Sequence, residues 1–298
     1  MKILKFAAID IGTNAIRLLF TNIIENGDAV SFKKSSITRV PIRLGADVFT
    51  TGKIGNIRKE KMMDAMIAFK HLMKVHDVTR YRACATSAMR EAANGKELVE
   101  WIKNKTGILI EIIDGKTEAE IIYHNRIVDM LDNETPYLYV DIGGGSTEIT
   151  LFFDKQALIS HSFNIGTIRL LNQQVDDKTF NTLKSKMKEI KKSYPGLTII
   201  GSGGNINKLL KLSRKKEGKP LPAEILKKVY NEIKDYTYEE RIKILGLNPD
   251  RADVIIPASE LLFKIVKWAG ANEIIVPKVG IADGIIRELY DDYLNEKN

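Results

Sequence analysis

The chain of 298 residues lacks the features that mark secreted, zinc-binding and membrane proteins. It has one cysteine, Cys84, so no disulfide can form within it, and a lone cysteine is typical of a reducing cytoplasm. Its four histidines show no zinc-ligand spacing. No apolar run approaches the roughly 20 residues that span a bilayer, and Asp10 comes too early for a signal peptide. We therefore expect a cytoplasmic protein with no membrane segment.

The composition that remains is that of a folded and moderately basic protein. Hydrophobic residues make up 44% and charged residues 28%, which argues against wholesale disorder. Lysine and arginine number 46 against 38 acidic residues, a net charge of +8, and this favours an anionic partner without identifying it. The length is sufficient for two domains that each bury a core.

Short β-rich runs alternate with longer helical stripes, which predicts an α/β fold. Helical spacing of apolar residues occurs in the stretches 62–73, 180–190, 225–233 and 261–269. The expected strands are Phe6–Ile9, Arg17–Thr21, Tyr81–Ala85, Ile108–Ile113, Tyr137–Ile142, Ile149–Phe153, Leu158–Phe163, Leu197–Ile200 and Glu273–Val276.

An internal repeat connects two of these strands. The segment Ile9–Asn14 resembles Val140–Gly145, since each places an aspartate and small residues at the end of an apolar strand. A second apolar strand follows in each case, so each segment predicts a β-hairpin with the aspartate near its tip. Two distant copies indicate two domains of similar design that face each other.

The hairpin tips and one further turn have the composition of phosphate-binding loops. Small residues let backbone N–H groups approach a phosphate closely, and the third turn leads into a helix whose positive end adds to the attraction. Neither a Walker A motif nor a dinucleotide fingerprint is present. A single such turn is equally typical of a tight hairpin, but three together favour phosphate binding. The three turns are Gly12–Asn14, with Gly12, Thr13 and Asn14; Gly143–Thr147; and Gly201–Asn205, with Gly203.

The acidic residues of the two tips are candidate metal ligands. Asp10 and Asp141 end their strands, and Glu148 follows the second turn. Mg²⁺ takes one or two carboxylates together with waters and substrate phosphates. A single aspartate in this position usually caps a turn, and it is the paired occurrence that favours a metal.

Two further segments carry candidate catalytic groups. Arg90 follows a strand and has the planar fork that neutralises phosphate, while Thr86 or Ser87 is a candidate helix cap. Glu118 stands in the first turn of a predicted helix, where it is either a catalytic carboxylate or a partner of the helix dipole.

Taken together, these segments resemble the exopolyphosphatase and guanosine pentaphosphate phosphatase (Ppx/GppA) family over nearly the whole chain. The resemblance implies two actin-like, ribonuclease-H-like domains with a cleft between them, and Mg²⁺-dependent removal of a terminal phosphate. By position, Glu118 resembles the catalytic base and Glu148 a second acidic residue near the attacking water. The resemblance also implies that Asp10 and Asp141 are the metal-side aspartates, and it implies phosphate binding by Asn14, Arg90, Gly143, Gly144, Gly145, Ser146 and Thr147. The stretches that carry it are Asp10–Asn14, Ala85–Arg90, Asp114–Glu120, Asp141–Glu148, Gly201–Asn205 and Arg251–Ile255.

The chain departs from the family pattern at several positions. The family's Ser-Gly-x-Glu-Glu-Ala-Arg is here Asp114–Glu120, with Thr117 and Glu120 in place of an acid and an arginine. Its Leu-Arg-Glu-Gly is here Ile281–Gly284, with Ala282 in place of the arginine, and Ala15 replaces a serine. These changes bear on substrate choice and turnover more than on the fold.

The expected domains are residues 1–122 and 123–283, with a C-terminal helix of about 284–298 that packs on the first. Polyphosphate or guanosine pentaphosphate is the expected partner, with no nucleic acid or membrane and with a homodimer permitted. The favoured function is an exopolyphosphatase. Three alternatives stay open: a guanosine pentaphosphate 5′-phosphatase with the same site, a non-hydrolytic actin-like nucleotide-binding protein, and a sugar kinase.

Overall fold

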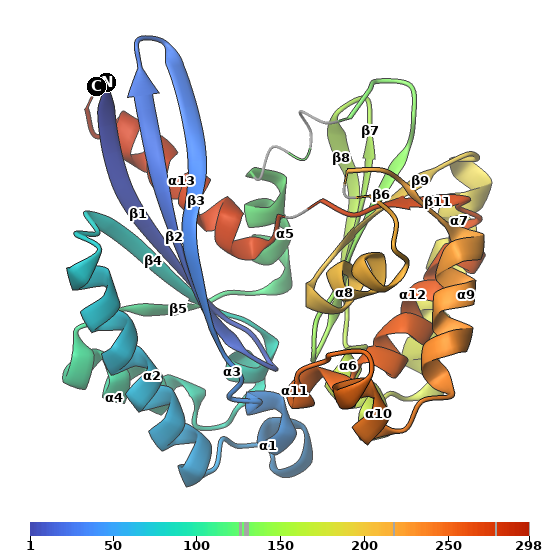
Figure 1. Ribbon diagram of the computed structural model, residues 1–298, viewed down its shortest axis with the longest axis horizontal. Helices are drawn as coiled ribbons and strands as arrows, with labels where there is room; N and C mark the ends of the chain where they lie inside the picture. The colour runs from blue at the N-terminus through green and yellow to red at the C-terminus, as the bar shows by residue number, and fades with distance from the viewer. Residues whose placement is uncertain (125–126, 128–130, 217, 278, 298) are drawn as a thin grey trace. The chain divides into compact units, whose positions relative to one another are not determined.

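Each half of the chain folds around its own β-sheet (Figure 1). The structure, a computed structural model, describes residues 1–124, 127, 131–216, 218–277 and 279–297. The first unit comprises Met1–Asn125 and Gly280–Asn298, and the second comprises Arg126–Val279. The division into domains at residues 122 and 283 stays a prediction.

The first unit contains a five-stranded mixed sheet in the order β3-β2-β1-β4-β5. Strands β1, β2 and β3 are antiparallel neighbours, while β4 and β5 continue the sheet parallel to β1. Helices α2 and α4 contribute to the core on one face, and α5 and α13 to the core on the other. The elements are β1 (Lys2–Ile11), β2 (Ile16–Asn26), β3 (Ala29–Val40), α1 (Leu44–Thr51), α2 (Asn56–Val75), β4 (Arg80–Ala85), α3 (Ser87–Glu91), α4 (Gly95–Thr106), β5 (Ile110–Ile112), α5 (Gly115–His124) and α13 (Ile281–Asn295).

The second unit contains a six-stranded sheet in the order β10-β11-β9-β6-β7-β8. Its large core includes inward-facing residues of β6, β7 and β9 with apolar faces of α7, α8, α9 and α12. The elements are β6 (Tyr137–Ile142), β7 (Thr147–Phe153), β8 (Gln156–Phe163), α6 (Thr167–Leu171), α7 (Asp177–Ser193), β9 (Thr198–Ser202), α8 (Gly204–Leu212), β10 (Leu221–Pro222), α9 (Ala223–Lys234), α10 (Tyr238–Lys243), α11 (Pro249–Ala252), α12 (Ile255–Ala269) and β11 (Glu273–Ile275).

The two sheets have the same construction, so the predicted repeat is a repeat of structure. The order β3-β2-β1-β4-β5 of the first unit corresponds to β8-β7-β6-β9-β11 of the second. In both, the first strand begins an antiparallel hairpin and then pairs in parallel with the fourth. The predictions of an α/β fold and of hairpins at the two repeated segments are confirmed.

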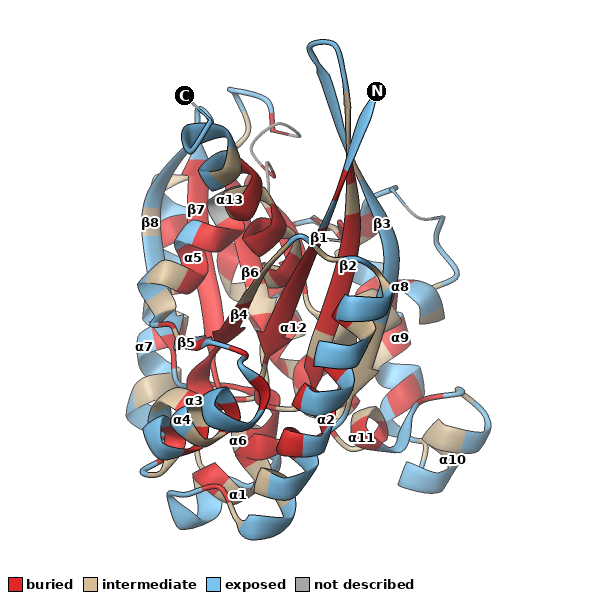
Figure 2. Ribbon diagram, turned by 90° about the vertical axis from the view of Figure 1, so that its left-hand side faces the viewer, coloured by how far each residue is buried: buried red, intermediate tan, exposed pale blue. Residues whose placement is uncertain are grey.

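The sequence pattern missed the long edge strand β3. Most of its side chains are exposed, as the pale strand in Figure 2 shows, and its centre reads Lys33-Lys34-Ser35-Ser36. Only its pairing with β2 makes it a strand, and a bulge interrupts this pairing at Phe20 and Thr21. A solvated edge strand carries too few apolar residues for its alternation to be read.

Candidate active site

The two hairpin tips form the same tight turn. In the first, the backbone N–H of Gly12 donates to the carbonyl of Ala15 at 3.2 Å, and in the second Gly143 donates to Ser146 at 2.9 Å. An added Cβ would meet that same carbonyl at 3.2 Å in the first tip and 3.1 Å in the second. Both turns therefore favour glycine as their first residue.

Residues at the start of α6 donate hydrogen bonds to the backbone carbonyls of the second tip. The N–H groups of Thr167 and Ile168 donate to the carbonyls of Gly143 and Gly144 at 3.0 and 2.8 Å. Arg169 Nε donates to the carbonyl of Gly145 at 2.7 Å. With three successive carbonyls bonded, the peptide planes of the turn are fixed before any ligand arrives, which is the pre-organisation that anion binding requires.

Gly166 is a supporting residue that the sequence analysis missed. A Cβ at this position would lie 2.4 Å from the carbonyl carbon of Gly144, a distance that real structures do not tolerate. Gly166 therefore lets α6 approach the backbone of the tip directly. The sequence shows a glycine between a predicted strand and the next helix, but it does not show that this glycine contacts Gly144, which is distant in sequence.

The first tip forms hydrogen bonds with the segment that follows β4. Thr13 Oγ1 and Ser87 Oγ form a buried hydrogen bond of 2.8 Å, and Thr86 N donates to the carbonyl of Ile11. Thr86 occupies the N-cap position of α3, as predicted, but makes no side-chain capping bond, and Ser87 pairs with Thr13. Two of the predicted segments are therefore neighbours in the first unit.

Glu118 is 5% exposed and lies in the first turn of α5. Asp114 caps this helix, because its Oδ1 accepts from Thr117 N at 2.8 Å, and the same hydrogen bond lowers the pKa of Asp114. Arg90 Nη1 donates to the carbonyl of Ile113 at 2.7 Å, directly before the cap. The structure thus places Arg90 beside the start of the helix that carries Glu118.

Helix α13 packs closely against α5 at one glycine, Gly284. A Cβ on Gly284 would lie 2.0 Å from the carbonyl oxygen of Ile121. The two helices therefore touch backbone to backbone. Arg82 on β4 adds ion pairs to Glu111 and to Glu288 of α13, which tie this helix to the sheet.

Asp10, the penultimate residue of β1, has a cationic neighbour. Its Oδ2 accepts from Arg17 Nη1, and the two residues lie opposite each other in the β1–β2 register. On its other side Asp10 is paired in register with Cys84, whose burial raises the pKa of the thiol to about 12. Cys84 is therefore a neutral core residue at physiological pH and no candidate nucleophile.

The corresponding position in the second unit carries two carboxylates. Asp141 lies opposite Glu148 in the β6–β7 register, so both side chains stand on one face of the sheet. Glu148 is 3% exposed and accepts from Ser162 Oγ at 3.0 Å. Gly203 has φ +106°, a conformation that favours glycine, and an added Cβ would make a tight contact of 3.0 Å with Asp141 Oδ1. The third glycine-rich turn therefore borders Asp141.

The donor chemistry of this pair fits a divalent cation. Within the described part of the chain, no three histidine, cysteine or carboxylate side chains form a group that could by itself hold a metal ion. Mg²⁺ needs only one or two carboxylates, because waters and substrate phosphates complete its shell. Asp141 and Glu148 supply hard oxygen donors on one face of the sheet, and Asp10 accepts a hydrogen bond from Arg17.

The predicted residues fall into two sets, one in each unit. The first set is Gly12, Thr13, Asn14, Asp10, Arg90 and Glu118, and the second is Asp141, Glu148, Gly203 and the turn 143–147. The convergence of the two sets on one ligand stays a prediction.

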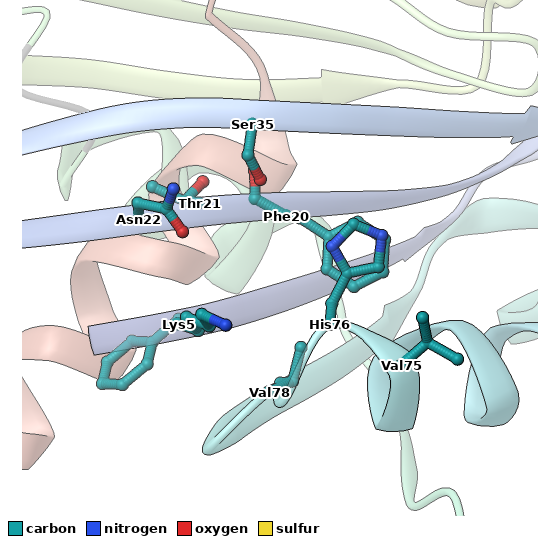
Figure 3. Close-up of a pocket in the computed structure, with 9 residues that line it drawn as sticks. Lys5, Phe20, Thr21, Asn22, Ser35, Val75, His76 and Val78 are labelled. Atoms are coloured by element: carbon teal, nitrogen blue, oxygen red, sulfur yellow. The ribbon is translucent and has the colours of Figure 1, made fainter. Parts of the chain in front are cut away.

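A cavity of about 250 Å³ lies elsewhere in the first unit (Figure 3). It opens beside the β3 bulge, where the ring of His76 stacks on Phe20, and none of the predicted site residues lines it.

In the described regions no helix has the length and apolar composition needed to cross a membrane.

Comparison with known proteins places this arrangement in a family. Residues 23–293 match the Ppx/GppA phosphatase family, and the chain belongs to that family. It is 27% identical over 321 residues to exopolyphosphatase 2 of Mycobacterium tuberculosis, covering 97% of this chain and 99% of the relative. It is 23% identical to the guanosine-5′-triphosphate,3′-diphosphate pyrophosphatase of Photobacterium profundum, covering 95% of this chain and 59% of that one.

A solved structure supports the fold. The Ppx/GppA family member of Aquifex aeolicus superposes with a TM-score of 0.76 at 26% identity, with both chains covered completely. Together with the repeated sheet topology, this likeness confirms the predicted two-domain, actin-like α/β fold.

Proposed function

We propose that the protein is an exopolyphosphatase that releases the terminal phosphate of inorganic polyphosphate by attack of water. The observation that carries the proposal is the buried Glu118, held in the first turn of α5 by the Asp114 cap and by the contact with α13. A buried carboxylate on a helix turn whose backbone is fixed in this way is suited to orient and deprotonate a water molecule. A protein that only binds nucleotide has no use for such a base.

The glycine-rich tips receive the terminal phosphate in this proposal. Backbone N–H groups of Thr13 and Asn14, and of the second turn after Gly143, donate to phosphate oxygens, and Arg90 adds a guanidinium. Because the carbonyls of the second turn are already bonded to α6, its donors need no rearrangement when charge develops on the transferred oxygens. Most of the rate enhancement in phosphoryl transfer comes from positioning and charge stabilisation of this kind.

A divalent cation, Mg²⁺ in our proposal, supplies positive charge at the phosphate oxygens when bound. Asp141 and Glu148 would hold it, with Asp10 as the predicted ligand from the first unit. Glu148 also remains the predicted second acid near the attacking water. The proposal places the protein in the cytoplasm, with a homodimer as its permitted assembly.

A guanosine pentaphosphate 5′-phosphatase is the second candidate, because relatives with that substrate in their names match 95% of this chain. Both activities release a terminal phosphate and require the same groups.

The test is phosphate release with Mg²⁺ from polyphosphate, guanosine pentaphosphate and ATP in parallel, repeated after removal of metal with EDTA. We expect metal-dependent release with polyphosphate as the preferred substrate. Release from the guanosine compound alone would establish the second candidate, and ATP binding without release from any substrate would refute both.

A further inference from the structure

The edge strand β8 carries a serine that touches one of the predicted catalytic carboxylates. Ser162 Oγ donates a hydrogen bond of 3.0 Å to Oε1 of Glu148. The two residues lie directly opposite each other in the β7–β8 register, so backbone pairing sets their contact. Ser162 is itself exposed, whereas Glu148 is 3% exposed.

A glutamate that serves a cation needs a defined orientation of its carboxylate plane. The terminal torsion of glutamate is broad, so the backbone alone does not fix that plane. Hydrogen bonds to the carboxylate fix it, and loss of such a partner typically weakens metal affinity or activity by about 10- to 100-fold. The bond from Ser162 engages one of the two oxygens of Glu148 and thereby restricts the plane.

We propose that Ser162 is a positioning residue that holds the Glu148 carboxylate in the orientation in which it meets the divalent cation. Ser162 acts through Glu148 and contacts none of the reacting atoms. The inference rests on the proposed function, because that proposal places the cation at Asp141 and Glu148.

The same strand provides a matched control. Ser160 lies two residues earlier on the same face of β8, opposite Thr150, and the two hydroxyl oxygens are 3.2 Å apart. Ser160→Ala therefore removes an equivalent hydroxyl from the same strand face and keeps the hydrogen bond between Ser162 and Glu148. Ser162→Thr keeps the hydroxyl group and is expected to keep the affinity for the cation.

Mn²⁺ is the probe that separates metal binding from turnover. The Kd for Mn²⁺ is measured on the full chain without substrate, by electron paramagnetic resonance of the free ion, and thermal unfolding is recorded for each variant. We expect Ser162→Ala to bind Mn²⁺ about tenfold more weakly, and Ser162→Thr and Ser160→Ala to bind it like the wild type. All three variants should retain the wild-type Tm.

Three results would overturn the proposal: wild-type affinity in Ser162→Ala, equal weakening in Ser160→Ala, or wild-type affinity in Glu148→Gln, since the cation would then not be at Glu148. Phosphate release by the wild type is measured separately. Binding of Mn²⁺ that depends on Ser162, without release of phosphate from any substrate, would support the positioning role and refute the hydrolytic function alone.

Discussion

Replacement of Glu118 by glutamine is expected to lower the rate of phosphate release from polyphosphate by about 10²- to 10⁴-fold, the range that a general base contributes. Glutamine has nearly the same shape but cannot accept the proton of the attacking water. The cap of α5 is made by Asp114, so the helix should persist in the variant. The measurements are steady-state phosphate release and the free energy of unfolding in urea.

Glu120 provides the control for this experiment. It lies two residues further along α5, is exposed, and forms an ion pair of 3.6 Å with Lys116. Glu120→Gln removes the same charge from the same helix, and a surface pair of this kind contributes little to stability. We expect Glu120→Gln to lose far less activity than Glu118→Gln, because its exposed carboxylate takes no part in the proton transfer. Full activity in Glu118→Gln, or equal loss in both variants, would contradict the role of Glu118 as base.

Gly284→Ala is expected to destabilise the fold by about 2 kcal/mol. The new methyl group would overlap the carbonyl of Ile121, so α13 or α5 has to move. Alanine is intrinsically better than glycine in a helix by about 1 kcal/mol, and a net loss therefore reports the clash rather than helix propensity. Since α5 carries Glu118, phosphate release should fall as well. Unfolding in urea at equilibrium gives the free energy.

Gly280→Ala is the matched substitution at the start of the same helix. An added Cβ there meets no heavy atom within 4 Å, and its φ of −155° suits any residue. This variant should keep its stability within about 0.5 kcal/mol. Stability of Gly284→Ala equal to that of the wild type would show that the two helices do not meet backbone to backbone.

The repeated hairpins were predictable because their signal is local. In each copy an apolar strand, an aspartate, small residues and a second apolar strand follow one another without interruption, as in Ile9–Phe20 and Val140–Phe153. The α/β class followed from the alternation of periodicities for the same reason. Each of these features lies within one stretch of chain, where spacing alone reveals it.

The supports of the site were not predictable, because they depend on pairs that are distant in sequence. Gly166 matters through the backbone of Gly144, and Gly284 through Ile121, which is 163 positions earlier in the chain. Ser162 touches Glu148 only because β7 and β8 pair in one register. A glycine or a serine can have many structural roles, and only the folded structure shows which of them applies.

The central claim is that water attacks the terminal phosphorus of polyphosphate. The most direct measurement is hydrolysis of polyphosphate of defined length in ¹⁸O-labelled water with Mg²⁺, followed by mass analysis of the products. The account predicts that each orthophosphate released carries one ¹⁸O atom and that the shortened chains carry none. Label in the shortened chains with unlabelled orthophosphate, or no release of orthophosphate at all, would contradict it.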